Sequence, residues 1–170
     1  MAKKSSAQHR SGCPVSTALE LVGDKWSLLI VRDVMVRGYR TFREFQRSGE
    51  GIATNILADR LHKLESGGIL VREPAEEDGR SMHFLLTEKG FALAPVLLEL
   101  LIWGAHYEET DAPCAAIEQM EQNRAAVIAE AYRRWQKRDP APLIPPFVKA
   151  AKPNRNSHPT FSSLKGRSKQ

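Results

Sequence analysis

Residues 51–90 read GIATNILADRLHKLESGGILVREPAEEDGRSMHFLLTEKG, and this stretch decides the fold. Its first part carries Leu57, Leu61 and Leu64 at helical spacing, with polar residues towards the opposite side. This pattern predicts an amphipathic helix from about residue 53 to residue 66. The two glycines that follow, at 67–68, are a helix stop signal.

The second part of the stretch predicts a hairpin. Residues 69–73 and 82–86 read as antiparallel strands, and Asp78-Gly79 between them supplies turn chemistry. Pro74 and the acidic residues after it belong to the connecting loop, and Thr87 caps a new helix. A helix followed at once by a two-stranded hairpin is the layout of a winged helix. In that fold the helix enters the DNA major groove and the hairpin, or wing, touches the flanking backbone.

The residues before this stretch predict the remaining helices of such a domain. Pro14 opens a first helix that ends at Gly23, and Asp24 caps an unusually apolar second helix at about residues 25–37. A Thr-x-x-Glu capping box at 41–44 begins a short third helix. The predicted fold class is mainly α with a small β-hairpin: a winged helix-turn-helix domain with C-terminal dimerisation helices.

Two longer helices are predicted after the hairpin, at about residues 88–109 and 115–135. The first of them carries more apolar surface than one small domain needs to fill its core. Together with the first helix, these helices are predicted to make a homodimer. The predicted interface residues are Leu97, Leu100, Leu101, Trp103 and Tyr107.

The chain therefore divides into four predicted parts. A disordered N-terminal arm (1–11) precedes the winged-helix DNA-binding domain (12–109), which is followed by a C-terminal dimerisation helix (110–136) and a basic, Pro-rich disordered tail (137–170). The tail holds eight Lys and Arg residues against one acid, whereas the rest of the chain holds 17 against 19. The net charge of +5 thus mostly describes the tail and is weak evidence for DNA binding by the folded domain.

Composition also excludes several classes of protein. We find no apolar run of transmembrane length and no apolar segment behind the basic N-terminus, so we expect a cytoplasmic protein without a membrane partner. Cys13 and Cys114 lie far apart and form no CxxC, which argues against a disulfide framework or a zinc site. No catalytic motif occurs, so we expect no enzyme activity, no metal and no cofactor.

The helix at 53–66 is the predicted reading element for double-stranded DNA. Thr54 and Asn55 lie in its first turn, where threonine can contact a thymine methyl group and asparagine can pair with adenine. Arg60 and Lys63 are better placed for phosphates. Asp59 either accepts from a cytosine amine or pairs with one of these cations and orients it. The alternative for each residue is an ordinary solvated polar face.

Further DNA contacts are predicted at two other places. Arg40, Thr41 and Arg43 lie at the entry to the third helix and are candidate phosphate contacts, although they also fit ordinary exposed residues. Arg80 is a candidate backbone or minor-groove contact of the wing. The acids at 76–78 in the same loop argue against deep insertion of the wing into DNA.

Several spaced motifs occur in one order over about residues 12–107. They are CPV at 13–15, GDKWSLLI at 23–30, FREF at 42–45, GIATNILADRL at 51–61, LE at 64–65, GI at 68–69, FLLTEKG at 84–90 and the segment from Leu97 to Trp103-Gly104. This series resembles the HxlR family of bacterial regulators, which are relatives of MarR-type winged helices. The resemblance implies a homodimeric repressor or activator that responds to reactive or aromatic small molecules, with double-stranded DNA as its partner.

Two points stay open at the level of sequence. Cys13 occupies the position at which some HxlR proteins carry a redox switch, and a helix start beside His9 and Arg10 would favour its thiolate; the alternative is a small, half-buried residue without chemistry. The function also has a rival reading, a winged-helix module that binds proteins and does not read DNA. The basic residues on the predicted reading helix argue against that rival.

Overall fold

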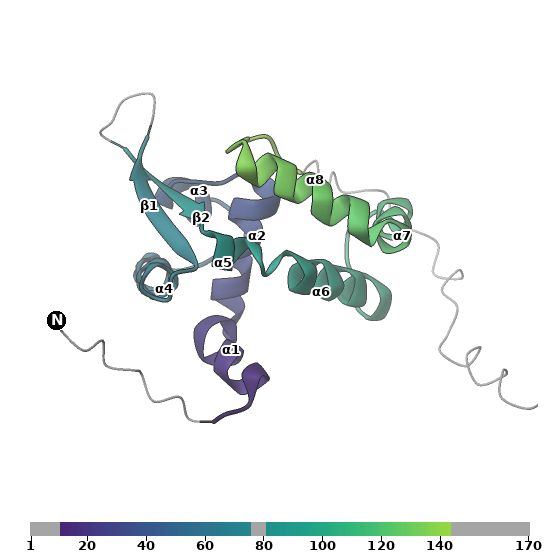
Figure 1. Ribbon diagram of the computed structural model, residues 1–170, viewed down its shortest axis with the longest axis horizontal. Coiled ribbons are helices and arrows are strands. Elements are labelled where there is room, and N and C mark those ends of the chain that lie inside the picture. The colour runs from purple at the N-terminus through teal and green to yellow at the C-terminus, as the bar shows by residue number, and fades with distance from the viewer. Residues whose placement is uncertain (1–10, 76–80, 144–170) are drawn as a thin grey trace, which may run out of the picture.

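The computed structural model describes residues 11–75 and 81–143 (Figure 1). In chain order its elements are α1 (Pro14–Val22), α2 (Lys25–Arg37), α3 (Phe42–Gln46), α4 (Thr54–Ser66), β1 (Leu70–Pro74), β2 (Met82–Leu86), α5 (Glu88–Phe91), α6 (Ala94–Tyr107), α7 (Cys114–Gln122) and α8 (Arg124–Gln136). The predicted fold class, helical with one antiparallel hairpin, is confirmed. Most of the predicted N-terminal arm, wing tip and tail lies outside the described residues.

Helix α2 runs through the middle of the molecule. Figure 1 shows α4 and the hairpin on one side of it and α6, α7 and α8 on the other. The main core lies between α2, α3, α4 and the hairpin. Its buried side chains are Val22, Ile30, Val31, Phe45, Ile52, Leu57, Leu61, Leu64, Ile69, Leu70, Phe84 and Leu86. The helical stripe that predicted α4 is therefore its buried face, as an amphipathic helix requires.

The hairpin pairs Leu70 with Leu86 at its base and Pro74 with Met82 at its far end. We expected Pro74 to break the strand, and this was wrong, because Pro74 is the last residue of β1. In a two-stranded sheet both strands are edge strands, and a proline is tolerated there because a missing outward N–H costs no ladder bond. On the outer side of β2, the Phe84 N–H donates to the Arg40 carbonyl at 2.7 Å, which ties the hairpin to the α2–α3 connection.

The helix predicted at 88–109 is two helices. The break falls at Ala92-Leu93, where the Leu93 N–H donates to the Gly90 carbonyl. Pro95 explains the break, since it has no N–H to continue the hydrogen-bonding ladder of α5. At Gly90 a Cβ atom would lie 2.1 Å from the carbonyl oxygen of Ile69, the residue before β1, so only glycine allows α5 to approach the chain this closely.

The stretch Glu88–Tyr107, 20 residues with a mean hydropathy of 1.4, has the length and composition of a membrane-spanning helix. This differs from our expectation that no stretch of the sequence would reach that length. In the structure the stretch is interrupted before α6, and the face of α6 formed by Ala94, Leu98 and Ile102 is buried within the protein. Helix α6 contacts α2, α7 and α8. We therefore interpret it as a packed helix of a folded domain.

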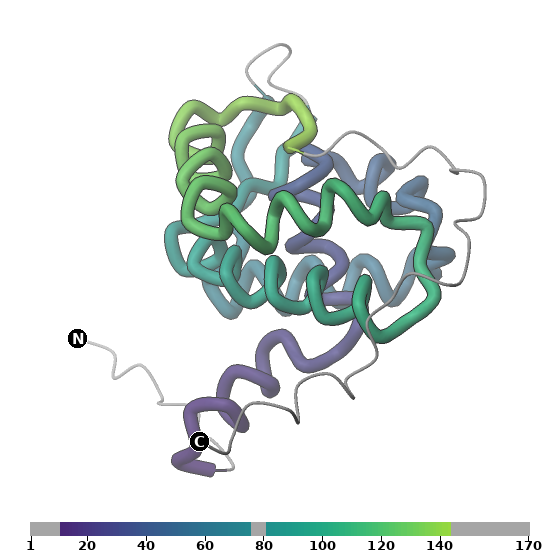
Figure 2. Tube along the Cα trace, turned by 90° about the vertical axis from the view of Figure 1, so that its right-hand side faces the viewer, coloured from purple at the N-terminus to yellow at the C-terminus, as the bar shows by residue number. Residues whose placement is uncertain are grey.

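The helix predicted at 115–135 is also divided, into α7 and α8. The division is at Asn123, whose side-chain amide donates to the Gln119 carbonyl at 2.9 Å. An asparagine side chain that bonds to the backbone competes with continued helix, which accounts for the break. Figure 2 shows α7 running back beside α6 and α8 crossing the N-terminal end of α6. There Arg124 of α8 pairs with Glu99 of α6 at 2.6 Å.

The C-terminal helix packs on α5. The Phe91 and Trp135 rings stack with centroids 5.1 Å apart, and Tyr132 meets Phe91 edge-on at 5.5 Å. The chain then continues in contact with the domain, because the Leu143 N–H donates to the Val36 carbonyl of α2 at 2.7 Å. The predicted start of a disordered tail at residue 137 therefore lies within structured chain; residues 144–170 lie outside the described residues.

Candidate nucleic-acid interface

Helix α4 presents two different faces. Leu57, Leu61 and Leu64 are buried in the core, whereas Thr54 and Asn55 in the first turn are exposed. The two side chains predicted to read bases therefore stand free of the core. Because three leucines fix the rotation of the helix about its axis, the direction of Thr54 and Asn55 is set by packing rather than by the surface.

The first turn of α4 is also fixed from α3. The Gln46 side-chain amide donates to the Thr54 hydroxyl oxygen at 3.0 Å. Ala53, which precedes the helix, supplies no side-chain cap. The hydroxyl oxygen of Thr54 is thus engaged by α3, while its methyl group remains available to a partner.

Asp24 holds the other half of α4. Its carboxylate caps α2 by accepting from the Ser27 N–H at 3.0 Å and the Ser27 hydroxyl at 2.7 Å. It also lies 3.5 Å from Arg60 Nε and 3.6 Å from Lys63 Nζ. Partial burial acts to raise the pKa of Asp24, but the Ser27 hydrogen bonds and the two cations outweigh it and lower the pKa below its ordinary value.

Arg60 and Lys63 are therefore already paired within the chain. The sequence predicted them as phosphate contacts, and their shared carboxylate was not foreseen, although the cap at Asp24 was. Asp59 lies 3.5 Å from Arg60 Nη2, which matches the second of its two predicted roles, pairing with a neighbouring cation. Arg60 Nε is buried and lacks a hydrogen bond, so Asp24 balances its charge without satisfying that donor.

The turn before α4 is anchored on the far end of α2. Asp33 is almost fully buried and pairs with Arg32 at 2.7 Å and Arg37 at 3.2 Å. Arg32 reaches Glu50 at 2.9 Å, and Arg37 donates to the Ser48 carbonyl. Burial raises the pKa of Asp33 even though both guanidinium groups act to lower it. This ion cluster fixes the α3–α4 turn and hence the start of α4.

The capping box of α3 is present as predicted. Glu44 accepts from the backbone N–H groups of Arg40 and Thr41, and the Glu44 N–H donates to the Thr41 hydroxyl. Partial burial acts to raise the pKa of Glu44, but these hydrogen bonds dominate and lower it. Thr41 is thereby engaged as a cap and is not free to contact phosphate.

The two arginines predicted beside this box differ. The Arg40 guanidinium donates to the Arg138 carbonyl, so it faces the C-terminal segment. Arg43 is exposed on α3 and keeps its predicted place at the surface. Arg80 of the wing lies outside the described residues. At the base of the wing, Arg72 pairs with Glu65 of α4 at 3.1 Å, a link between hairpin and reading helix that the sequence did not reveal.

Residues 21–112 match the family model described as HxlR-like helix-turn-helix. This span covers α2 to α6, all the elements that build the reading helix and the hairpin, and more than half of the chain. The chain belongs to the HxlR-like helix-turn-helix family. The predicted resemblance is thereby confirmed, and α8 lies beyond the matched region.

Relatives of this HxlR-like protein are regulators. It is 32% identical over 104 residues to YdeP of Bacillus subtilis (strain 168), an uncharacterized HTH-type transcriptional regulator. The matched region covers 61% of this chain and 80% of YdeP. It is 34% identical over 104 residues to YodB of the same organism, an HTH-type transcriptional regulator, covering 60% of this chain and 92% of YodB.

Solved structures agree. The crystal structure of PA1607 is 43% identical with a TM-score of 0.55, covering 61% of this chain and 71% of PA1607. The redox regulator HypR in its oxidized form is 32% identical with a TM-score of 0.52, covering 58% of this chain and 100% of HypR. The HxlR-like protein is therefore an HTH-type transcriptional regulator and not an enzyme.

The cysteine of interest, Cys13, lies at the N-cap of α1 and is exposed, and its side chain makes no capping hydrogen bond. His9 and Arg10, which we expected to favour its thiolate, lie outside the described residues. Cys114 is exposed as well and begins α7. The two thiols thus stand in similar settings, at the starts of two exposed helices.

An apolar stripe on α6 is uncovered in the single chain. Val96, Leu100, Trp103 and Tyr107 recur at helical spacing and are each about half exposed, with Tyr107 at 58%. Of the other predicted interface residues, Leu97 packs against the main core and Leu101 is half-buried. Helix α1 is similar, because Val22 is buried while Val15 and Leu19 of its predicted stripe stay exposed.

The Asp24 pair gives a pH-dependent prediction. Asparagine caps helices as well as aspartate does, so Asp24→Asn should keep the hydrogen bond from the Ser27 N–H. It loses the second carboxylate oxygen, which accepts from the Ser27 hydroxyl, and the attraction to Arg60 and Lys63. At pH 7 the variant should unfold with a free energy lower by up to about 1 kcal/mol. Since folding lowers the pKa of Asp24, this difference is present above the unfolded pKa of 3.8 and is lost as the pH falls through the folded value.

Denaturant unfolding at pH 3 to 7 measures the difference. Asp111→Asn, which removes an exposed carboxylate from the α6–α7 connection, is the control and should show no such trend. A loss of stability in Asp24→Asn that does not change with pH would contradict a charge interaction.

Proposed function

We propose that this HxlR-like regulator binds a palindromic DNA operator as a homodimer in the cytoplasm, with Thr54 and Asn55 of α4 reading base edges. The observation that carries the proposal is that both side chains are exposed on a helix whose opposite face is locked into the core. A reading helix must hold its side chains in fixed directions for base contacts to discriminate. The family relationship supplies the helix-turn-helix context.

Phosphate contacts fall to the cations around that helix. Arg43 on α3 is exposed, and Arg60 and Lys63 keep part of their surface open beside Asp24. Arg80 of the wing is proposed from the sequence alone. Asp59 orients Arg60 in this proposal, consistent with their 3.5 Å separation. Such contacts position the protein on the duplex without specifying a sequence.

Selection of duplexes from a random pool tests the proposal directly. The expected product is a sequence with two related half-sites about one helical turn, roughly 34–36 Å, apart. An electrophoretic shift assay then compares this duplex with the upstream region of the protein's own gene. Absence of any enriched sequence would contradict sequence-specific binding.

Asn55→Ala tests the reading helix. It should weaken binding to the selected duplex by about 1–3 kcal/mol and leave binding to random DNA nearly unchanged, since only the base contact is lost. Gln122→Ala, an exposed amide at the end of α7, is the control and should bind both duplexes like the wild type. Equal losses on both duplexes would show that Asn55 contacts backbone or shapes the fold.

The dimer is proposed to form through the apolar stripe of α6, with α1 beside it in the interface. The rings of Trp103 and Tyr107 lie 5.6 Å apart and form one exposed aromatic surface with Leu100. A stripe of this kind on a single chain normally marks an interaction site. A second copy of the same stripe is a self-complementary partner, as two-fold symmetry requires.

Leu100→Glu should convert the dimer into a folded monomer at micromolar concentration. Leu100 is 47% exposed in the single chain, so a carboxylate there meets water in the monomer but would be buried unpaired in the dimer. Sedimentation velocity measures the state. Met82→Glu, at a hairpin residue that is 40% exposed, is the matched control and should remain dimeric. A wild-type monomer would end this part of the proposal.

We also propose that oxidation of Cys13, or a small-molecule effector that reacts with it, changes the spacing of the two reading helices. The exposed thiol at the start of α1 and the redox function of HypR support this proposal. Because both half-sites must be matched at once, a small rotation of one subunit would weaken binding to the operator.

Cys13→Ser should abolish the effect of a mild oxidant on operator affinity, whereas Cys114→Ser should retain it. The second variant is a matched control because both cysteines are exposed at helix starts. Titration of operator binding before and after oxidant measures the change, and mass spectrometry distinguishes an intermolecular disulfide from an adduct. Equal sensitivity in wild type and Cys13→Ser would overturn the proposal.

A further inference from the structure

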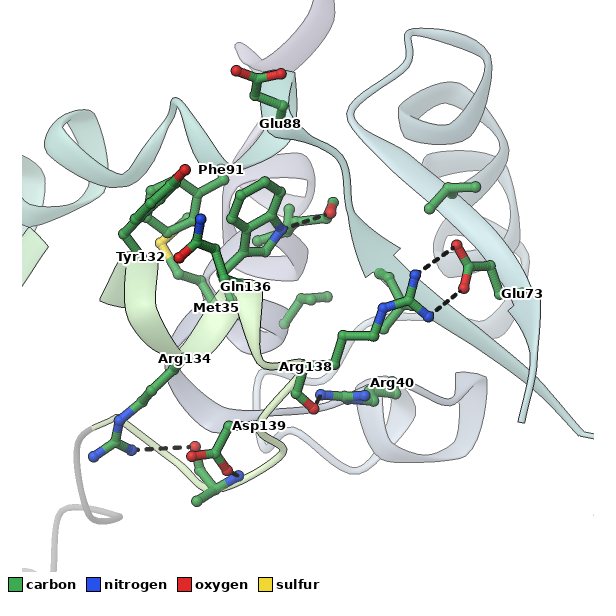
Figure 3. A pocket seen from close by; sticks show the side chains of 16 residues that line it. Met35, Arg40, Glu73, Glu88, Phe91, Tyr132, Arg134, Gln136, Arg138 and Asp139 are labelled. Atoms are coloured by element: carbon green, nitrogen blue, oxygen red, sulfur yellow. Dashed lines mark hydrogen bonds and ion pairs between the residues drawn. The ribbon is translucent and has the colours of Figure 1, made fainter. Parts of the chain in front are cut away.

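The segment at 135–143, which we call the C-terminal latch, crosses from the end of α8 alongside the hairpin to α2. It lies outside the family match at 21–112. Figure 3 shows its side chains lining a cleft of about 510 Å³ beside β1, β2 and α2. Across this cleft the latch contacts the hairpin through two polar interactions, one from Trp135 and one from Arg138.

Each strand of the hairpin receives one such contact. The Trp135 indole N–H donates to the Leu86 carbonyl at the end of β2 at 2.8 Å. Arg138 binds Glu73 of β1 with two nitrogens, at 2.6 and 3.3 Å (Figure 3). Both contacts reach the hairpin from the side of α8, far along the chain from either strand.

The latch is itself held in place on α2 and the α2–α3 connection. The Arg40 guanidinium donates to the Arg138 carbonyl, and the Leu143 N–H donates to the Val36 carbonyl. Stacking of Trp135 on Phe91 fixes its beginning. At Gly38 a Cβ atom would lie 2.0 Å from the Pro140 carbonyl oxygen, and Gly38 has a φ of +72°, so this position must be glycine for the latch to pass.

Backbone conformation singles out Arg138. Among the residues that the structure describes, it alone has a positive φ without being glycine, at 52°. This left-handed residue closes a Schellman cap on α8, in which the Asp139 N–H donates to the Arg134 carbonyl and the Arg138 N–H to the Trp135 carbonyl. This cap turns the chain so that the Arg138 guanidinium reaches Glu73 while its carbonyl accepts from Arg40.

The cleft does not carry a ligand assignment of its own, because its arginines are engaged by the protein. Arg138 pairs with Glu73, Arg134 pairs with Glu130 at 2.7 Å and donates to the Pro142 carbonyl, and Arg40 binds the latch. Its polar groups thus connect the latch to the hairpin. This leaves the latch contacts themselves as the functional feature of the cleft.

We infer that Trp135 and Arg138 are positioning residues that set the angle of the wing relative to the reading helix. A two-stranded hairpin is marginally stable alone, so its orientation depends on what it packs against. β1 is tied to α4 through Arg72 and Glu65, and the latch holds the same strand from the opposite direction through Glu73. This inference rests on the proposed DNA-binding function, because the wing angle matters only on a duplex.

Hydrogen exchange of the DNA-free protein tests the latch without DNA. Arg138→Gln should speed exchange of the hairpin amides at 70–74 and 82–86 by up to about fivefold, which corresponds to the 0.2–1 kcal/mol of an exposed ion pair. Trp135→Phe, which keeps the stacked ring and loses the N–H, should act in the same direction. Amides of α2 report global unfolding and should exchange as in the wild type.

Arg133→Gln is the matched control. Arg133 lies on α8, its side chain is 48% exposed against 52% for Arg138, and its partner is Glu130 on the same helix. It should leave hairpin exchange unchanged. If hairpin exchange is equally fast in wild type, Arg138→Gln and Trp135→Phe, the latch does not hold the wing and the inference falls.

Binding to the selected duplex is the second measurement. Arg138→Gln should weaken specific binding by up to about fivefold, while binding to random DNA changes no more than in Arg133→Gln. Faster hairpin exchange with unchanged specific affinity would overturn the positioning role. Failure of the wild type to select any duplex would instead count against the proposed function, so the two failures are distinguishable.

Discussion

Everything at the DNA-binding face depends on how α4 is fixed against α2. Three leucines of α4 bury its inner side, but apolar packing alone allows a helix to slide and rotate slightly. Two carboxylates, Asp24 at the N-cap of α2 and Asp33 within α2, remove that freedom. Asp24 holds Arg60 and Lys63 at one end, and Asp33 organises Arg32 and Arg37 around the turn at the other. Apolar burial stabilises the packing of α4 on α2, and the ion pairs fix the position of α4 along and around its axis.

Ion pairs also hold the wing, one from each side of β1. Arg72 of β1 pairs with Glu65 on α4, and the next residue, Glu73, pairs with Arg138 behind the hairpin. Neighbouring residues of a strand point to opposite faces, so two consecutive positions face two different anchors. Leu70, Phe84 and Leu86 of the hairpin are buried in the main core, so these polar contacts add to apolar packing in setting its orientation.

Sequence reasoning predicted the fold well where the signal is local. The leucine stripe of α4, the cap at Asp24 and the Thr41–Glu44 box are contacts or periodicities within a few residues, and all are present. It failed where one residue interrupts a long pattern. Pro95 and Asn123 each divided a predicted helix, because an apolar stripe continues across a break that the backbone does not. Pro74 was excluded from a strand that tolerates it.

The candidate site was predicted only in part, for a related reason. The exposure of Thr54 and Asn55 follows from helical periodicity, and the structure reproduces it. The partners of Arg60, Lys63 and Arg40 do not follow, because they come from residues 36 to 98 positions away in the chain. No spacing rule connects Arg138 to Glu73. Long-range charge pairing is decided by tertiary structure.

The pairing of Arg60 and Lys63 with Asp24 also bears on the thermodynamics of association. Counterion release from DNA scales with the number of phosphates that a protein neutralises. Cations that already face a carboxylate bring less net charge to the duplex than free ones. The net positive charge around α4 is therefore smaller than its basic residues suggest. In the proposed complex this restrains the affinity for arbitrary DNA and leaves a larger share of the binding free energy to the base contacts proposed for the first turn of α4.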